Sequence, residues 1–122
     1  MSETPVGVTV SQFQLALDES SGLPAAFVQI LHFGPALWWV WIGDSQAQAG
    51  DLAVAFPGVH TAAARTSVLG SLNDSVSEEL CAKLSQRLRN PIYLSYNYLT
   101  TARAMAELEK ALLVALKDRQ LV

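Results

Sequence analysis

The segment 37–42 constrains the fold more than any other part of the chain, because all six of its residues are apolar and three are tryptophans. Successive side chains of a β-strand point to opposite faces. Both faces of such a strand would be apolar, so each needs a covering layer. All six residues are candidates for a partner interface, in two sets that face opposite ways: Leu37, Trp39 and Trp41, and Trp38, Val40 and Ile42.

The other strands are predicted from the alternation of apolar and polar residues. Val6–Val10 and Phe13–Leu17 alternate in different phases, so a bulge or a bend is expected near Ser11-Gln12. Further strands are expected over residues 25–33, 36–42, 52–56, 66–69 and 92–98.

Residues 20–43 carry no charge over 24 positions, which is long enough to span a membrane. Gly34-Pro35 lies within this stretch, where proline would break a helix. Two strands joined at Gly34-Pro35 are the better interpretation, and no membrane association is expected.

Two helices are predicted in the second half of the chain. Ser75 and Glu78 have the spacing of a capping box, which indicates a helix start, and Asn90-Pro91 ends that helix. The second helix is expected over residues 102–117, with four residues facing inward: Met105, Leu108, Leu112 and Leu116.

The predicted order is four or five strands, a helix, a strand and a helix. This order indicates an α+β fold, with a mostly antiparallel β-sheet of about six strands and two main helices. We expect a single domain over residues 1–122, with residues 1–5 flexible. The helices can cover one face of the sheet. The other face needs either a partner, which would be a second copy in a homodimer when the chain is isolated, or a second layer built from Val6–Leu17 and Leu52–Phe56.

Charge is unevenly distributed along the chain. The net charge is −3, which argues against a broad surface for nucleic acid. Residues 1–64 contain no Lys or Arg, whereas the remainder contains all eight. Either the two halves have different solvated faces, or a polarised surface meets a charged partner in a fixed orientation. Arg87 and Arg103 are the candidate residues for steering such a partner.

The cysteine content and the N-terminal sequence bear on the compartment. The single cysteine, Cys81, excludes a disulfide framework and is typical of a reducing compartment. The first residues do not combine a basic segment with an apolar core, as a signal peptide would. We expect a cytoplasmic protein that can also enter the nucleus.

The residues that could support catalysis or metal binding are scattered. His32, His60 and Cys81 lack metal-ligand spacing, and Cys81 lies on the apolar stripe of a helix. Asp44 and Asp51 flank a polar loop and are expected to be solvated. No nucleophile elbow or phosphate-binding loop is present in the sequence. We therefore expect no enzyme, no metal and no cofactor, but a binding or assembly role.

Five short motifs follow one another along the chain: Leu37-Trp-Trp-Val-Trp-Ile-Gly43, Asp51-Leu-Ala-Val-Ala55, Thr66-Ser-Val-Leu-Gly70, Leu80-Cys-Ala-Lys-Leu-Ser-Gln-Arg-Leu88 and Ile92-Tyr-Leu-Ser-Tyr-Asn97. Their order and spacing resemble those of the proteasome assembly chaperone 4 family, over roughly Val6 to Leu116. Ser95, Tyr96 and Asn97 are among the most specific pieces. We expect them to hold the end of a strand rather than to contact a partner.

The resemblance implies a non-enzymatic chaperone of 20S proteasome assembly. Members of this family pair with proteasome assembly chaperone 3, and the pair helps the proteasome α-subunits to close into a ring. A chaperone-3-like protein and the α-subunits are therefore the implied partners. Two alternatives stay open, which are another small α+β adaptor or trafficking module and a small enzyme that uses His60 or Asp51.

Overall fold

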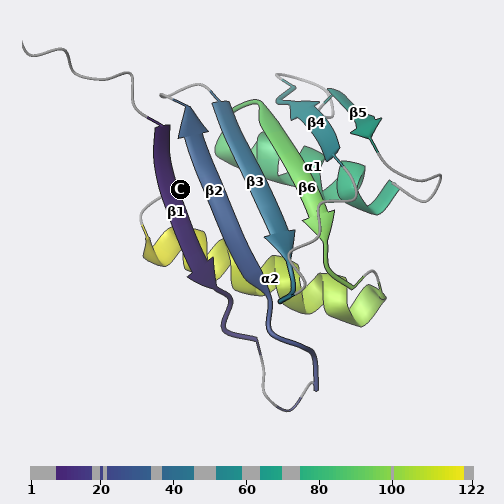
Figure 1. Cartoon of the computed structure of the whole chain (residues 1–122). Coiled ribbons are helices and arrows are strands. Elements are labelled where there is room, and N and C mark those ends of the chain that lie inside the picture. The colour runs from purple at the N-terminus through teal and green to yellow at the C-terminus, as the bar shows by residue number, and fades with distance from the viewer. Residues whose placement is uncertain are drawn as a thin grey trace, which may run out of the picture.

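The computed structural model describes residues 8–17, 20, 22–33, 37–45, 52–58, 64–69, 75–99 and 101–119. Within them the chain forms six strands and two helices, in the predicted order (Figure 1). The strands are β1 (Val8–Gln14), β2 (Phe27–Phe33), β3 (Leu37–Gly43), β4 (Leu52–Phe56), β5 (Ala64–Leu69) and β6 (Ile92–Asn97), and the helices are α1 (Ser75–Leu88) and α2 (Ala102–Asp118). Residues 1–5, Asp51 and His60 lie outside the described residues.

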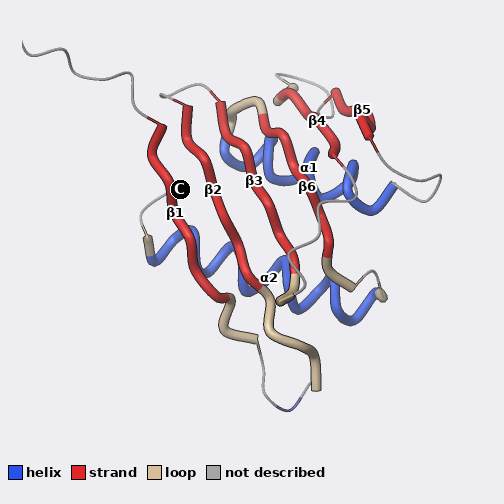
Figure 2. The backbone as a smooth tube through the Cα atoms, in the orientation of Figure 1, coloured by secondary structure: helices blue, strands red, loops and turns tan. Residues whose placement is uncertain are grey.

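All six strands form one sheet, in the order β1-β2-β3-β6-β4-β5 (Figure 2). β3 and β6 are parallel, and every other neighbouring pair is antiparallel. β6 therefore lies between β3 and β4, although α1 and β5 separate it from them in the sequence. This arrangement confirms the predicted α+β fold with a mostly antiparallel sheet.

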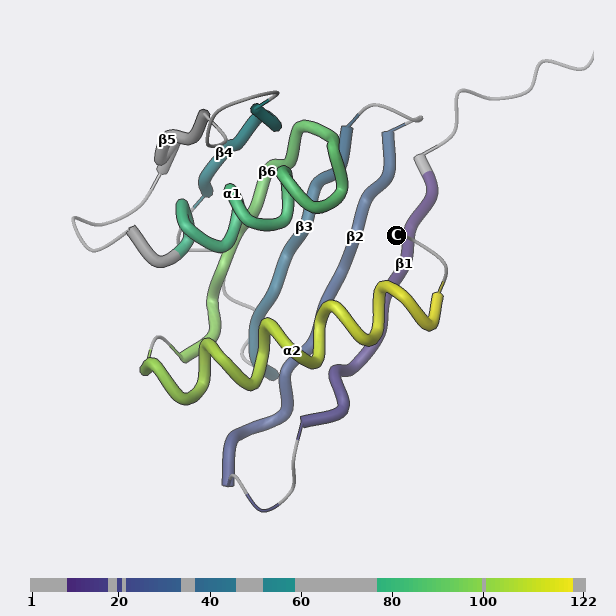
Figure 3. The backbone as a smooth tube through the Cα atoms, turned by 180° about the vertical axis from the view of Figure 1, so that it is seen from behind, coloured from purple at the N-terminus to yellow at the C-terminus, as the bar shows by residue number. Residues whose placement is uncertain are grey.

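The two helices lie on the same face of the sheet (Figures 1 and 3). Four residues of α2, one turn apart, are buried against it: Ala104, Leu108, Leu112 and Leu116. From α1, Leu80, Cys81 and Leu84 join the same core. No helix within the described residues is long and apolar enough to span a membrane.

The predicted bulge near Ser11-Gln12 is not present. β1 pairs with β2 without interruption, from Val8 opposite Phe33 to Gln14 opposite Phe27. The apolar residues change face along β1, because Val10 is exposed on one side while Phe13 is buried on the other. Because of this change of face, the alternation of apolar and polar residues shifts by one position in the sequence although the strand itself is regular.

The second covering layer considered from the sequence is also absent. β1 and β4, which would have supplied it, are strands of the same sheet as β3. A strand cannot lie in a sheet and also cover its face. The described part of the chain is therefore one helical layer on one sheet.

Side-chain hydrogen bonds hold the start of α2 and the last turns of α1. At the start of α2 the backbone N–H of Ala104 donates to Thr101 Oγ1 at 3.2 Å, a helix cap. At the end of α1 the buried Ser85 hydroxyl contacts the carbonyl oxygens of Asn90, at 2.7 Å, and Ala55, at 3.3 Å. Helix α1 begins at Ser75 as expected, but the predicted capping box depends on the Ser75 side chain, which lies outside the described residues.

Candidate partner interface

The face of the sheet opposite the helices is not covered by any described element (Figures 1 and 3). We call it the open face. Side chains directly opposite each other on neighbouring strands share a face. The pairing register therefore shows which residues of the open face lie side by side, even where they are far apart in the sequence.

One line of apolar residues crosses the open face over five strands. We call it the apolar row, and the register joins its members in this order: Val10, Leu31, Trp39, Tyr93 and Val54. The rings of Trp39 and Tyr93 are stacked, with centroids 5.4 Å apart. Val10 is 53% exposed, Leu31, Trp39 and Tyr93 are half-buried, and Val54 is buried; Phe56, further along β4, is 49% exposed. An exposed apolar surface of this kind is typical of a protein–protein contact.

A second line, two residues further along β3, is mostly polar. We call it the amide row, and it runs through Gln12, Gln29, Trp41 and Ser95. A shallow hollow of about 350 Å³ lies here, lined by residues of β1, β2 and β3. The indole of Trp41 lies over Gly43, because a Cβ atom on Gly43 would be only 2.4 Å from Trp41 Cζ2. The absent side chain of Gly43 thus leaves room for the indole to lie along the strand.

The structure divides the six apolar residues of β3 between the two faces, as the alternation predicted. Leu37, Trp39 and Trp41 are half-buried on the open face, where a partner can reach them. Trp38, Val40 and Ile42 lie beneath the helices and are at most 2% exposed. As candidates for a partner contact these last three are corrected to core residues, since α1, α2 and the neighbouring strands already cover them.

Arg87 and Arg103 are both exposed, but they lie on the helices and not on the open face. Arg87 lines a groove between α1 and α2, beside the ion pair of Lys83 Nζ with Glu109 Oε2 at 3.4 Å. Arg103 is in the first turn of α2. The structure thus separates the candidate charged contacts from the candidate apolar ones.

None of the nine residues in the apolar and amide rows is charged. Burying an unpaired charge is costly, so a face without charge can be covered by another protein at low cost. Sequence reasoning identified only Trp39 and Trp41 among these nine as interface candidates. The other seven lie on β1, β2, β4 and β6, and only the pairing register shows that they adjoin the tryptophans.

The most specific motif of the sequence resemblance holds the end of β6. The Tyr96 hydroxyl donates a hydrogen bond to the carbonyl oxygen of Leu99, just beyond the end of the strand. The Asn97 side chain also bonds at this end of the strand, where its Nδ2 donates to Ser95 Oγ at 2.9 Å and reaches Ile42 O at 3.5 Å. Asn97 therefore ties β6 to the end of β3.

Cys81 and His32 are both placed in structural roles. The Cys81 thiol is fully buried and donates to the carbonyl oxygen of Ile92 at 3.1 Å, and burial raises its pKa to about 12. His32 packs edge-on against Trp38, with ring centroids 4.2 Å apart, and burial lowers the pKa of its imidazole. Within the described residues no three potential metal ligands come together.

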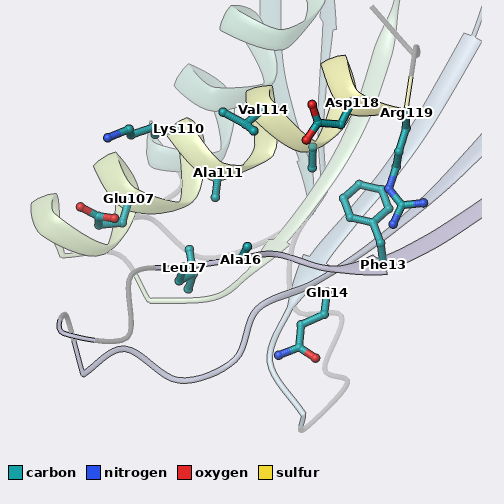
Figure 4. Close-up of a pocket in the computed structure, with 11 residues that line it drawn as sticks. Phe13, Gln14, Ala16, Leu17, Glu107, Lys110, Ala111, Val114, Asp118 and Arg119 are labelled. Atoms are coloured by element: carbon teal, nitrogen blue, oxygen red, sulfur yellow. The ribbon is translucent and has the colours of Figure 1, made fainter.

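A groove of about 530 Å³ lies between α2 and the segment that follows β1 (Figure 4). Its apolar lining includes Phe13, Leu17 and Val114. The guanidinium of Arg119 lies 4.2 Å from the centroid of the Phe13 ring, a cation–π contact at one end of the groove. The charged side chains that line the groove are those of Glu107, Lys110, Asp118 and Arg119.

The structure is that of an α+β domain, with one face of its sheet packed under helices and the other open and crossed by the apolar row. A sequence model described as proteasome assembly chaperone 4 matches residues 25–98, which is more than half of the chain. The chain therefore belongs to the proteasome assembly chaperone 4 family.

Among the solved structures with a similar fold is a chain of a chaperone complex for yeast 20S proteasome assembly. The two share 14% sequence identity with a TM-score of 0.64, over 89% of this chain and 96% of that one. At this identity the likeness shows the fold. No curated protein sequence matches this chain.

Proposed function

We propose that this protein is a non-enzymatic chaperone of 20S proteasome assembly that works as a heterodimer with a chaperone-3-like protein. The two sheets stack face to face, with the helices of both proteins on the outside. Membership of the proteasome assembly chaperone 4 family supports the role, and the open apolar face supports the mode of pairing.

The single observation that carries the pairing is the apolar row. It places Leu31, Trp39 and Tyr93 side by side across three central strands, with no described element above them. Burying one large apolar side chain stabilises a complex by about 1.5–3 kcal/mol, so leaving such a row in water is unfavourable. A second sheet packs at about 10 Å from the first and would cover the whole row.

The α-subunits are the proposed substrates of the heterodimer, in the cytoplasm or the nucleus. Stacking of the sheets leaves the helical layer free, and Arg87 and Arg103 lie on that layer. In this proposal the open face binds the chaperone partner, and the basic side chains of the helices guide the pair to an α-subunit surface that is acidic. When the chain is isolated, we propose that a second copy covers the open face.

The proposal is tested by measuring the affinity of the chain for a purified chaperone-3-like protein with two matched variants. Trp39→Ala removes the centre of the apolar row and should weaken binding by about 2 kcal/mol or more. Val114→Ala removes an apolar side chain that is 54% exposed on α2 and should leave the affinity unchanged. Equal effects of the two variants, or no binding by the unaltered chain, would contradict the proposal.

A further inference from the structure

The open face is divided along the direction of its strands. The apolar row crosses one half, and the amide row crosses the other, two residues further along β3. Hydrophobic burial is non-directional, so the apolar half alone does not determine which way round a second sheet lies. Hydrogen bonds are directional and can determine it.

Gln12 and Gln29 are the two glutamines of the amide row, and solvent reaches both, since Gln12 is exposed and Gln29 is half-buried. They lie directly opposite each other on β1 and β2, and both line the hollow beside Trp41. Within the described part of the chain, neither amide makes a side-chain hydrogen bond to another protein group. Each amide carries two N–H donors and a carbonyl acceptor, so the pair presents both kinds of group to whatever covers it.

We propose that Gln12 and Gln29 set the orientation of the partner sheet by hydrogen-bonding to uncharged polar side chains of that sheet, such as serine, threonine, asparagine or glutamine. This inference rests on the proposed heterodimer. A charged partner side chain fits less well, because neither row supplies an opposite charge. A partner sheet turned end for end would place apolar side chains over both amides and leave them buried without hydrogen bonds.

The two amides therefore favour the correct orientation of the partner sheet and also disfavour the incorrect ones. A partner that presents polar groups only over the apolar row, or only apolar groups over both rows, is disfavoured. The hollow beside Trp41 gives the partner side chains a place to enter, and the apolar row supplies most of the buried area. Specificity and affinity are then carried by different halves of the open face.

The test is calorimetric titration of a purified chaperone-3-like protein with the full chain and three variants. Gln12→Leu/Gln29→Leu removes both amides and leaves the polar groups of the partner unpaired, so binding should weaken about tenfold or more. Gln12→Glu/Gln29→Glu keeps the side-chain shape and solubility and should also weaken binding. Thr9→Leu, an exposed change on the other face of β1, should alter the affinity by less than about twofold.

The outcomes separate this inference from the proposed function. If the unaltered chain binds and both double variants bind as tightly as it does, the inference is wrong and the proposed heterodimer stands. If the unaltered chain does not bind, the proposed heterodimer itself is wrong. A double-mutant cycle completes the test, in which Gln29→Leu is combined with alanine at each uncharged polar residue of the partner's sheet. A coupling energy between Gln29 and one partner residue locates the contact. The absence of coupling at every partner residue overturns the inference.

Discussion

The indole of Trp39 lies nearly flat on the phenol ring of Tyr93, with an angle of 12° between the ring planes. The two residues are 54 positions apart in the sequence, but their strands, β3 and β6, are adjacent in the sheet. Stacked rings restrict each other's rotation, so little conformational entropy is lost when a partner covers them. The pair therefore forms a rigid centre of the open face.

Gly43 should not tolerate a side chain. A Cβ atom there would lie 2.4 Å from Trp41 Cζ2 and 2.6 Å from Cη2, so Gly43→Ala must displace the indole. We expect a loss of about 1–3 kcal/mol in the free energy of unfolding, measured by urea denaturation. Ser45→Ala, an exposed change in the following turn, is the control and should have little effect. An unaltered stability of Gly43→Ala would show that the indole does not occupy this place.

Cys81 should be almost unreactive in the folded protein. Its pKa is raised from 9.0 to about 12 by burial, so the reactive thiolate is about a thousandfold rarer than in the unfolded chain at pH 8. The measurement compares the labelling rate by a thiol reagent in buffer and in denaturant. Similar labelling rates in the two conditions would mean that α1 readily separates from the sheet and exposes Cys81.

His32 should make the protein less stable in mild acid. Burial lowers its pKa below 6.5, so the unfolded chain binds the proton more tightly than the folded one. The stabilisation from neutral His32 is therefore present above pH 6.5 and is lost as the pH falls towards its folded-state pKa. His32→Asn should flatten the curve of unfolding free energy against pH between 7 and about 5. An unchanged slope in that variant would assign the pH dependence to other groups.

Charge reversal on the helical layer should slow association with the α-subunits. Arg87→Glu and Arg103→Glu remove exposed positive charges, which mainly affects the encounter rate and its dependence on salt. Stopped-flow measurement should show a lower on-rate at low salt, with a smaller effect on the off-rate. Unchanged on-rates for both variants would remove electrostatic steering from the account.

The alternation of residues in the sequence was sufficient to predict the order of the elements and the α+β class. It also separated Trp39 from Trp38 correctly, because alternation along a strand is a local property. It could not say which set faces the helices, since both sets are equally apolar. That choice is made by long-range contacts, in which Ile92 and Leu94 of β6 lie beside Trp38 and Val40.

The wider open face was hidden from the sequence for a related reason. Val10 and Gln12 become neighbours of the β2 and β3 residues only through the pairing register, which no local pattern encodes. The same register made β1 part of the sheet rather than a layer above it. A strand whose apolar residues change face looks like a strand with a bulge until its partner is known.

Hydroxyl-radical footprinting of the tryptophans tests the central claim most directly, because the three residues are distributed between the two faces. The chain is oxidised alone, at a concentration where sedimentation shows a monomer, and then in complex with the chaperone-3-like protein. We predict that Trp39 and Trp41 are oxidised in the free chain and protected in the complex, while the buried Trp38 is protected in both. Continued oxidation of Trp39 and Trp41 in the complex, with new protection at Val114 on α2, would contradict the account.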